Sequence, residues 1–239
     1  MAQEPGEELP RLTVRLLARA GSGCPRRTYK EHTGNPMMGG ANRKYRVLNQ
    51  VEEDARLAHT SMTAASSSHF HPQTSDLIEE ERAVYELAAR WYVALFGDRP
   101  VRVDDLDADP METVAPRTGI RLVGGAGMAL VDPAGMHELR MLSIGDRNTE
   151  EILESVSVRF AILRRARWSR AGPLRVVRAD LHGGWSVEEQ ADGTELFESA
   201  RVWMIDQLAR IGDHMHPVNT IVGSECGTCA FIPGCRALR

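Results

Sequence analysis

The stretch from Gly127 to Gly145 reads G-M-A-L-V-D-P-A-G-M-H-E-L-R-M-L-S-I-G, and it decides the fold. The run from Gly127 to Val131 predicts a strand. Asp132-Pro-Ala-Gly135 is a turn signal, because aspartate, proline and glycine each favour turn conformations. The run from His137 to Ile144 predicts the returning strand. The stretch therefore predicts two strands joined by a tight turn.

Helices and further strands are predicted on both sides of this pair. A capping box of Asp76 and Glu79 starts a helix that carries Trp91 and Phe96 on its apolar side and ends at Gly97. Asn148 can cap another helix, and a last one runs from Thr194 to Gly212. The other predicted helices cover 13–32 and 43–59, and the other predicted strands cover 101–103, 119–123, 173–181 and 185–189.

This order of elements predicts an α/β sandwich with a mixed central sheet flanked by helices. Residues 1–10 are polar and contain proline, which predicts a flexible tail. Residues 11–239 then form a single domain. Within it, the low-complexity stretch 60–75 predicts a mobile loop.

Composition excludes several protein classes. The chain has 239 residues, of which 42% are hydrophobic and 26% charged, as in an ordinary globular protein. No run approaches ~18 consecutive apolar residues, which argues against a membrane span or a membrane partner. The start lacks the basic and apolar segments of a signal peptide, which favours a cytoplasmic location. A net charge of -4 excludes a protein dominated by basic charge but permits a local basic patch.

The four cysteines are divided between the chain ends. Cys24 stands alone, whereas Cys226, Cys229 and Cys235 form C-G-T-C-A-F-I-P-G-C. In a cytoplasmic chain, clustered thiols more often bind metal than form disulfides. Structural zinc sites commonly use two close pairs of ligands, so the division of one and three suits an iron–sulfur cluster better. Zinc, and unligated or disulfide-paired thiols, are the alternatives.

A cluster on these cysteines would join the chain ends. Connecting Cys24 to Cys226 closes a loop of about 200 residues, and a covalent crosslink of that span stabilises a fold by roughly 5 kcal/mol. We therefore expect the cluster to act as a staple, so that its oxidation destabilises the whole domain.

The cysteine frame resembles that of a known family. Cys24 opens C-P-R-R-T-Y-K-E-H after a short helical pattern from Thr13 to Ala20, and C-x2-C-x5-C follows about 200 residues later. This looks like the iron–sulfur RecB-type nucleases of the PD-(D/E)XK superfamily, which include the AddB nuclease domain and the stand-alone exonucleases of CRISPR spacer acquisition. The resemblance spans residues 11–236. It implies a [4Fe-4S] cluster on the four cysteines and a restriction-endonuclease-like fold.

The resembled nucleases carry an acidic residue on one strand and D/E-x-K on the next, and the carboxylates hold a divalent metal. Aligned on the turn at Asp132, this pattern is substituted. Gly127 stands at the first acid, Met141 at the second and Ser143 at the lysine. Glycine and methionine side chains offer magnesium or manganese no hard oxygen ligand. Only the helical histidine of the family pattern is matched, by His59.

A divergent metal site is the alternative. Glu138-Leu-Arg140 reads as E-x-R, Asp132 could supply the first acid, and His59 could add a ligand. Such a site would need magnesium or manganese. Against it, Asp132 lies in a predicted turn, and arginine is a poor substitute for a compact ammonium group. No lysine follows Lys44, which excludes the usual triad on the strand.

A run of arginines could hold phosphates. No acidic residue interrupts the chain from Ser155 to Ala179, and Trp168 in that run could stack a base. The alternative is a solvated helix end, where cations favour the helix dipole. The predicted nucleic-acid-binding residues are Arg159, Arg164, Arg165, Arg167 and Arg170.

These observations lead to one main hypothesis and two rivals. The main hypothesis is a catalytically degenerate nuclease-like protein that keeps its cluster and binds DNA or serves as a partner subunit. The first rival is an active metal-dependent DNA exonuclease with the divergent site. The second rival is a redox-responsive module that binds a protein partner and no nucleic acid.

Overall fold

The computed structural model describes a large part of the chain. The predicted tail, most of the predicted loop over 60–75, the four cysteines, Arg167 and Arg170 lie outside the described residues. The described residues are 11–13, 40–60, 65, 67–70, 77–104, 112–115, 120–123, 127–145, 151–165 and 172–215.

The contacts divide the chain into two compact units, of which the first comprises residues 1–36, 110–125 and 199–239. Its described strands are β1 (Arg11–Thr13), β3 (Glu112–Ala115) and β4 (Ile120–Val123). They form a sheet in the order β1-β4-β3, with β1 parallel and β3 antiparallel to β4. The expected helix from Thr13 is wrong at its start, because the backbone of Thr13 pairs with that of Val123.

The second unit comprises residues 37–109 and 126–198 and contains a five-stranded sheet. The sheet order is β2-β5-β6-β7-β8, in which β6 and β7 are parallel and the other neighbours antiparallel. The predicted α/β class with a mixed sheet is therefore confirmed, whereas the restriction-endonuclease-like fold and the cluster staple stay predictions. The strands are β2 (Arg102–Val103), β5 (Met128–Val131), β6 (His137–Ser143), β7 (Pro173–Asp180) and β8 (Trp185–Asp192).

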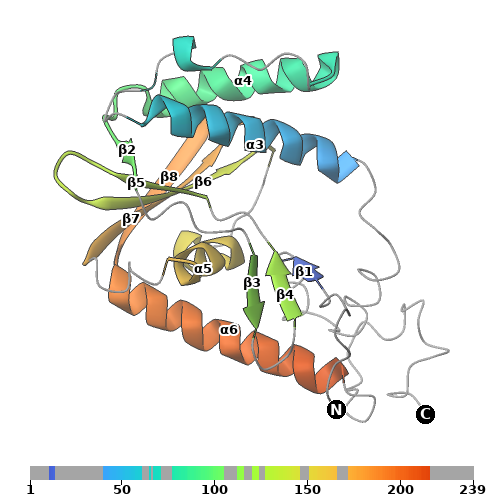
Figure 1. The fold of residues 1–239 in the computed structure, drawn as a ribbon. Coiled ribbons are helices and arrows are strands. Elements are labelled where there is room, and N and C mark those ends of the chain that lie inside the picture. Colours follow the sequence, from blue (N-terminus) through green and yellow to red (C-terminus); the bar gives the residue numbers. More distant parts are fainter. Residues whose placement is uncertain are drawn as a thin grey trace. The chain divides into compact units, whose positions relative to one another are not determined.

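Helices α3 (Gly40–Ala58) and α4 (Glu79–Phe96) lie on one face of this sheet, and α5 (Val156–Leu163) lies on the other (Figure 1). Successive strand residues point to opposite faces. Leu130 and Leu142 accordingly belong to the core beneath α3 and α4, while Ala129 and Leu139 belong to the core with α5. Two short 3-10 turns, η1 (Ser67–His69) and η3 (Ile152–Glu154), and the helix α6 (Gly193–Met215) complete the described elements.

Two helix starts differ from the sequence-based expectation. At α4, the Ile78 N–H donates to Glu81 Oε2 at 3.2 Å, so Glu81 takes the capping position expected of Glu79. At α5, Ser155 Oγ accepts from Val158 N at 3.3 Å, so Ser155 caps this helix, and the expected cap, Asn148, lies outside the described residues. Each helix begins where a side chain first reaches an orphan backbone donor.

The buried face of α4 also differs from the expectation. Tyr85 and Tyr92 are fully buried, whereas Trp91 is 37% exposed. The two tyrosines are buried because their hydroxyl groups have hydrogen-bond partners inside the fold. Tyr85 Oη donates to Asp54 Oδ2 on α3, and Tyr92 Oη accepts from Arg140 on β6. A buried hydroxyl with a partner avoids the desolvation cost that would otherwise keep tyrosine at the surface.

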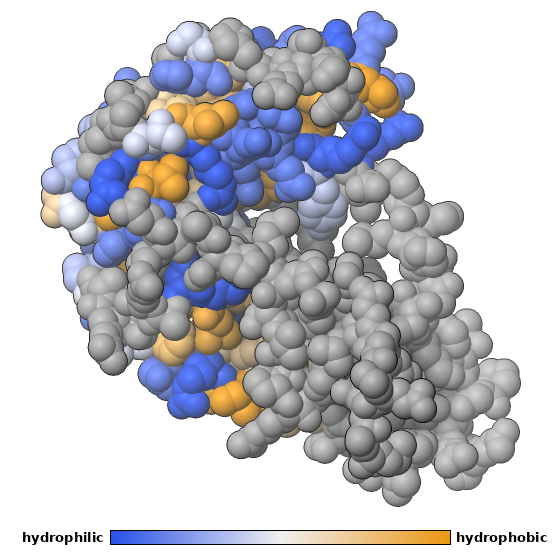
Figure 2. Space-filling view, viewed as in Figure 1, coloured by the Kyte–Doolittle hydropathy of each residue, from blue (hydrophilic) through white to orange (hydrophobic). Residues whose placement is uncertain are grey.

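The face of the molecule that Figure 2 shows is largely polar where its residues are described. Figure 2 shows hydrophilic residues over most of the coloured surface, with apolar residues in small separate groups. None of the described helices combines the length and apolar character that a membrane span requires.

Candidate functional site

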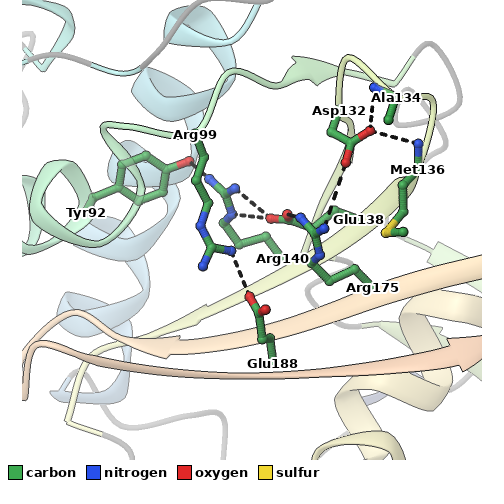
Figure 3. A network of polar contacts seen from close by, with 9 residues as sticks. All are labelled: Tyr92, Arg99, Asp132, Ala134, Met136, Glu138, Arg140, Arg175 and Glu188. Atoms are coloured by element: carbon green, nitrogen blue, oxygen red, sulfur yellow. Dashed lines mark hydrogen bonds and ion pairs between the residues drawn. The ribbon is translucent and has the colours of Figure 1, made fainter.

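The turn of the β5–β6 hairpin is held by Asp132. Its backbone N–H donates to Met136 O, and its backbone carbonyl accepts from Gly135 N, both at 3.0 Å. Its Oδ1 accepts from the N–H groups of Ala134 and Met136, both at 2.9 Å (Figure 3). Gly135 has a φ of +83°, which glycine adopts at little cost. The predicted turn is confirmed, and Asp132 has a clear structural role in it.

Gly127 and Met141 lie side by side at the open end of the same hairpin. A Cβ added to Gly127 would collide with Met141 Sδ and lie 2.7 Å from the carbonyl oxygen of Arg140. Gly127 also has a φ of +62°, which favours glycine. An aspartate at position 127 therefore has neither room nor a relaxed backbone while Met141 stands beside it.

The carbonyl oxygen of Gly127 accepts from two arginines. Arg56 on α3 donates through Nη2 at 2.9 Å, and Arg165, which follows α5, donates through Nη2 at 3.1 Å. Arg165 Nη1 also donates to Ala161 O at 2.9 Å, and its side chain is buried. Arg165 therefore lies inside the fold.

Glu52 on α3 interacts electrostatically with the same two arginines. Burial raises its pKa to about 7, and the positive charges of Arg56 and Arg165 oppose that rise. Burial likewise lowers the pKa of Arg56, against the attraction of Glu52. The two guanidinium groups at the Gly127 carbonyl thus interact electrostatically with one carboxyl group whose pKa is raised.

Ser143 lies at the end of β6. Its Oγ donates to Ala179 O at 3.2 Å and lies 3.4 Å from Asp180 Oδ1. Asp180 also accepts from the N–H groups of Gly145 at 2.6 Å and Gly183 at 2.8 Å. Lys44 on α3 reaches this end of β6, because its Nζ lies 3.3 Å from where a Cβ on Gly145 would be. The sequence analysis did not predict that this lysine lies close to the hairpin.

Glu138 and Arg140 are both buried and form an ion pair on the face of β6 beneath α4. Arg140 Nε and Nη2 lie 2.7 and 2.6 Å from Glu138 Oε1. The guanidinium carbon of Arg140 also lies 3.9 Å from the centre of the Phe96 ring. Burial acts to lower the pKa of Arg140, but Tyr92 and Glu138 outweigh burial and raise it. Arg140 is therefore held as a cation inside the core.

Tyr92 connects this ion pair to His59. Arg140 Nη1 donates to Tyr92 Oη at 2.6 Å, and Tyr92 Oη lies 2.9 Å from His59 Nε2. Because arginine only donates, the tyrosine oxygen is the acceptor in its contact with Arg140, and its contact with His59 Nε2 takes its direction from the tautomer of His59. Burial raises the pKa of Tyr92, against the lowering effect of Arg140. His59 is thus linked through Tyr92 to the buried ion pair of Glu138 and Arg140.

Arg175 on β7 joins Glu138 to Asp132. Its Nη1 lies 3.5 Å from Glu138 Oε2, and its Nη2 lies 3.8 Å from Asp132 Oδ2. We call Asp132, Glu138, Arg140, Arg175 and Tyr92 the charged network; Figure 3 shows its side chains converging between the hairpin and α4. The structure therefore brings Asp132, Glu138 and Arg140 of the alternative site together. The two carboxylates are connected by Arg175, and Glu138 is also paired with Arg140.

A magnesium or manganese ion does not fit the donor atoms of this region. Glu138 faces Arg140 with one oxygen and Arg175 with the other, so a cation would have to displace a guanidinium group. Gly127 and Met141 supply no carboxylate. Across the described ranges, no three histidine, cysteine, aspartate or glutamate side chains are grouped as metal ligands.

The five arginines predicted to bind phosphates do not share one environment in the structure. Arg159 and Arg164 are half-buried on α5 and at its C-cap, and the guanidinium carbon of Arg164 lies 5.8 Å from the Phe160 ring centre. Arg165 is buried, as described above. Arg167 and Arg170, like the four cysteines, lie outside the described residues.

Sequence reasoning missed the partners of these groups. Tyr92, Arg175, Arg56 and Glu52 come from three elements distant along the chain. The spacing of Tyr85 and Tyr92 was the one available signal, because two residues seven apart share a helix face.

The comparisons assign this chain to no family. No protein-family model matches it, and no curated protein matches it in sequence.

Proposed function

We propose that the chain is a nuclease-like protein that binds nucleic acid without cutting it, and that Cys24, Cys226, Cys229 and Cys235 hold a [4Fe-4S] cluster. The observation that carries the proposal is the open end of the hairpin. Gly127 and Met141 lie together there, at the two positions that hold carboxylates in the resembled nucleases. Both positions are uncharged in this chain.

The order of elements supports the comparison with those nucleases. The antiparallel β5–β6 hairpin supplies two adjacent strands for the paired acid positions. Helix α5 then connects β6 to the parallel strand β7, and helices lie on both faces of the sheet. This arrangement is compatible with the mixed sheet that the resemblance implies.

Positive charge at the open end supports binding rather than cutting. The metal ion of a nuclease supplies positive charge next to a phosphate. Here the half-buried Arg56 supplies guanidinium charge at the Gly127 carbonyl, and the half-buried Arg159 and Arg164 add charge on α5 and at its C-cap. Phosphate binding by arginine needs no metal and leaves the phosphodiester intact.

An anaerobic mobility-shift assay tests the proposal. Purified protein, with iron and sulfide quantified, is mixed with end-labelled single-stranded, double-stranded and forked DNA in the presence of manganese. We expect a shift with intact DNA and about four iron atoms per chain. The shift should weaken steeply with salt. A double variant, Arg159→Gln with Arg164→Gln, should weaken it, whereas Arg99→Gln on another segment should not.

Other outcomes overturn the proposal. DNA that is shortened with manganese and stays intact when the manganese is chelated with EDTA would establish the metal-dependent exonuclease. A chain without iron would exclude the cluster. A chain with iron that neither shifts nor cuts DNA would instead support the redox-responsive module with a protein partner.

A further inference from the structure

β8 is the outer edge of the five-stranded sheet. It runs for eight residues from Trp185 to Asp192, and no described strand pairs with its outer side. All of its residues except Trp185 and Ala191 are exposed. An edge strand of this length offers unpaired backbone N–H and C=O groups to another chain.

The register identifies which groups those are. Gly193 N donates to Gly172 O at 2.8 Å, so this pair is hydrogen-bonded. Bonded pairs alternate along an antiparallel ladder, so Val187, Glu189 and Ala191 direct their backbone groups toward β7. The backbone groups of Ser186, Glu188 and Gln190 therefore point away from the sheet.

The edge is acidic. β8 contains Glu188, Glu189 and Asp192 and no basic residue. Glu188 forms an exposed ion pair with Arg99 at 2.8 Å, and that contact lowers its pKa. Glu189 lies on the opposite face beside Val187, which is 44% exposed. A strand that pairs here meets carboxylates on both faces and an apolar side chain on one.

A second copy of the chain fits this edge poorly. Antiparallel pairing of two β8 strands about Glu188 or Glu189 places carboxylates opposite or next to one another. Like charges across a strand pair are destabilising. The edge therefore favours a partner of opposite charge.

We propose that β8 binds an extended basic peptide segment of a partner protein as an additional strand. The backbone groups of Ser186, Glu188 and Gln190 form the ladder, and lysine or arginine side chains of the segment lie near Glu189. The aliphatic stem of one of these basic side chains packs along Val187, which lies on the same face as Glu189. This inference is independent of the proposed nucleic-acid binding, since β8 contributes no basic residue.

A labelled peptide of alternating lysine and valine, acetylated and amidated at its ends, is the probe. We expect fluorescence anisotropy with the full chain to show binding of this peptide and none of its glutamate–valine counterpart. Hydrogen exchange should show new protection at the amides of Ser186, Glu188 and Gln190. Protection elsewhere with no change at these three amides would overturn the proposal.

Two variants sharpen the test. Gln190→Pro removes an outward N–H but no hydrogen bond to β7. The variant should therefore keep its unfolding midpoint, and its affinity for the peptide should fall about tenfold. Gln190→Ala is the matched control and should bind normally. Glu189→Lys should transfer preference to the glutamate–valine peptide. Unchanged binding by both Gln190→Pro and Glu189→Lys, or a dimer that Gln190→Pro abolishes, would overturn the proposed occupant.

Discussion

Within the β5–β6 hairpin, Glu138 and Arg140 are buried and paired, whereas Gly127 and Met141 at the open end carry no charge of their own. The charged network connects the hairpin to α4 through the hydrogen bond of Arg140 to Tyr92 and to β7 through the ion pair of Glu138 and Arg175. The open end instead receives its charge from arginines on other elements. The difference teaches that a buried carboxylate such as Glu138 does not by itself indicate a metal site. Each of its oxygens faces an arginine, although it lies close to positions that hold metal ligands in the resembled nucleases.

Breaking the charged network should have the largest effect. Glu138→Gln leaves the buried cation of Arg140 without its carboxylate, which should cost about 3–5 kcal/mol in the free energy of unfolding. Urea denaturation measures this loss. Replacing both residues, by Glu138→Leu with Arg140→Met, should cost less than Glu138→Gln alone. A loss below about 1 kcal/mol for Glu138→Gln would show that the pair is solvated.

Restoring an acid at the open end should be the next most costly change. Gly127→Asp adds a Cβ against Met141 Sδ at a positive φ, so we expect a loss of about 2–3 kcal/mol. Gly135→Ala is the control, since its φ is also positive but nothing lies within 4 Å of an added Cβ. It should cost about 1 kcal/mol. Thermal unfolding of Gly127→Asp with and without manganese would contradict this interpretation if manganese stabilised the variant.

The pH dependence of stability should distinguish the open end from the charged network. The folded-state pKa of Glu52, about 7, exceeds its ordinary value of 4.5. Between these values the folded chain binds the extra proton, so the contribution of Glu52 to stability falls as pH rises from 4.5 to 7 and stays low above pH 7. Glu52→Gln should remove that slope and gain on the order of 2 kcal/mol above pH 7. An unchanged slope in urea titrations across this range would contradict the assignment.

The exposed pair of Arg99 and Glu188 should matter least. Both side chains are more than a third exposed, so Arg99→Gln should cost only about 0.2–1 kcal/mol. The loss should shrink further in high salt, because salt screens exposed charges. Urea denaturation at two salt concentrations measures it. A loss as large as that of Glu138→Gln would place this pair within the charged network.

The hairpin was predictable because its signals are local. Asp132-Pro-Ala-Gly135 encodes the turn, and the apolar runs on either side encode β5 and β6. β3 was not predicted, because Glu112–Ala115 adjoins an acidic stretch and gains its strand character by pairing with β4. Strand pairing is a tertiary interaction, and a four-residue window does not contain it.

Some residues of the candidate site were predictable from the sequence, but the contacts between them were not. Sequence singled out Glu138, Arg140 and His59, but their roles depend on Tyr92, which lies 48 positions from Arg140. Neither periodicity nor spacing identifies which arginine meets which carboxylate, since this depends on sheet register and helix placement. The three positions Gly127, Met141 and Ser143 were inferred by alignment on the turn, and the contact of the first two is a property of the folded hairpin.

The carbonyl of Gly127, bound by Arg56 and Arg165, constrains how this sequence can change. A carboxylate at position 127 demands a smaller residue at 141 and a relaxed backbone, while each arginine would lose the geometry of its present bond. A carboxylate at position 127 is therefore harmful as long as Met141 stands beside it. The order of substitutions therefore matters: a smaller residue at position 141 has to come before any side chain at position 127.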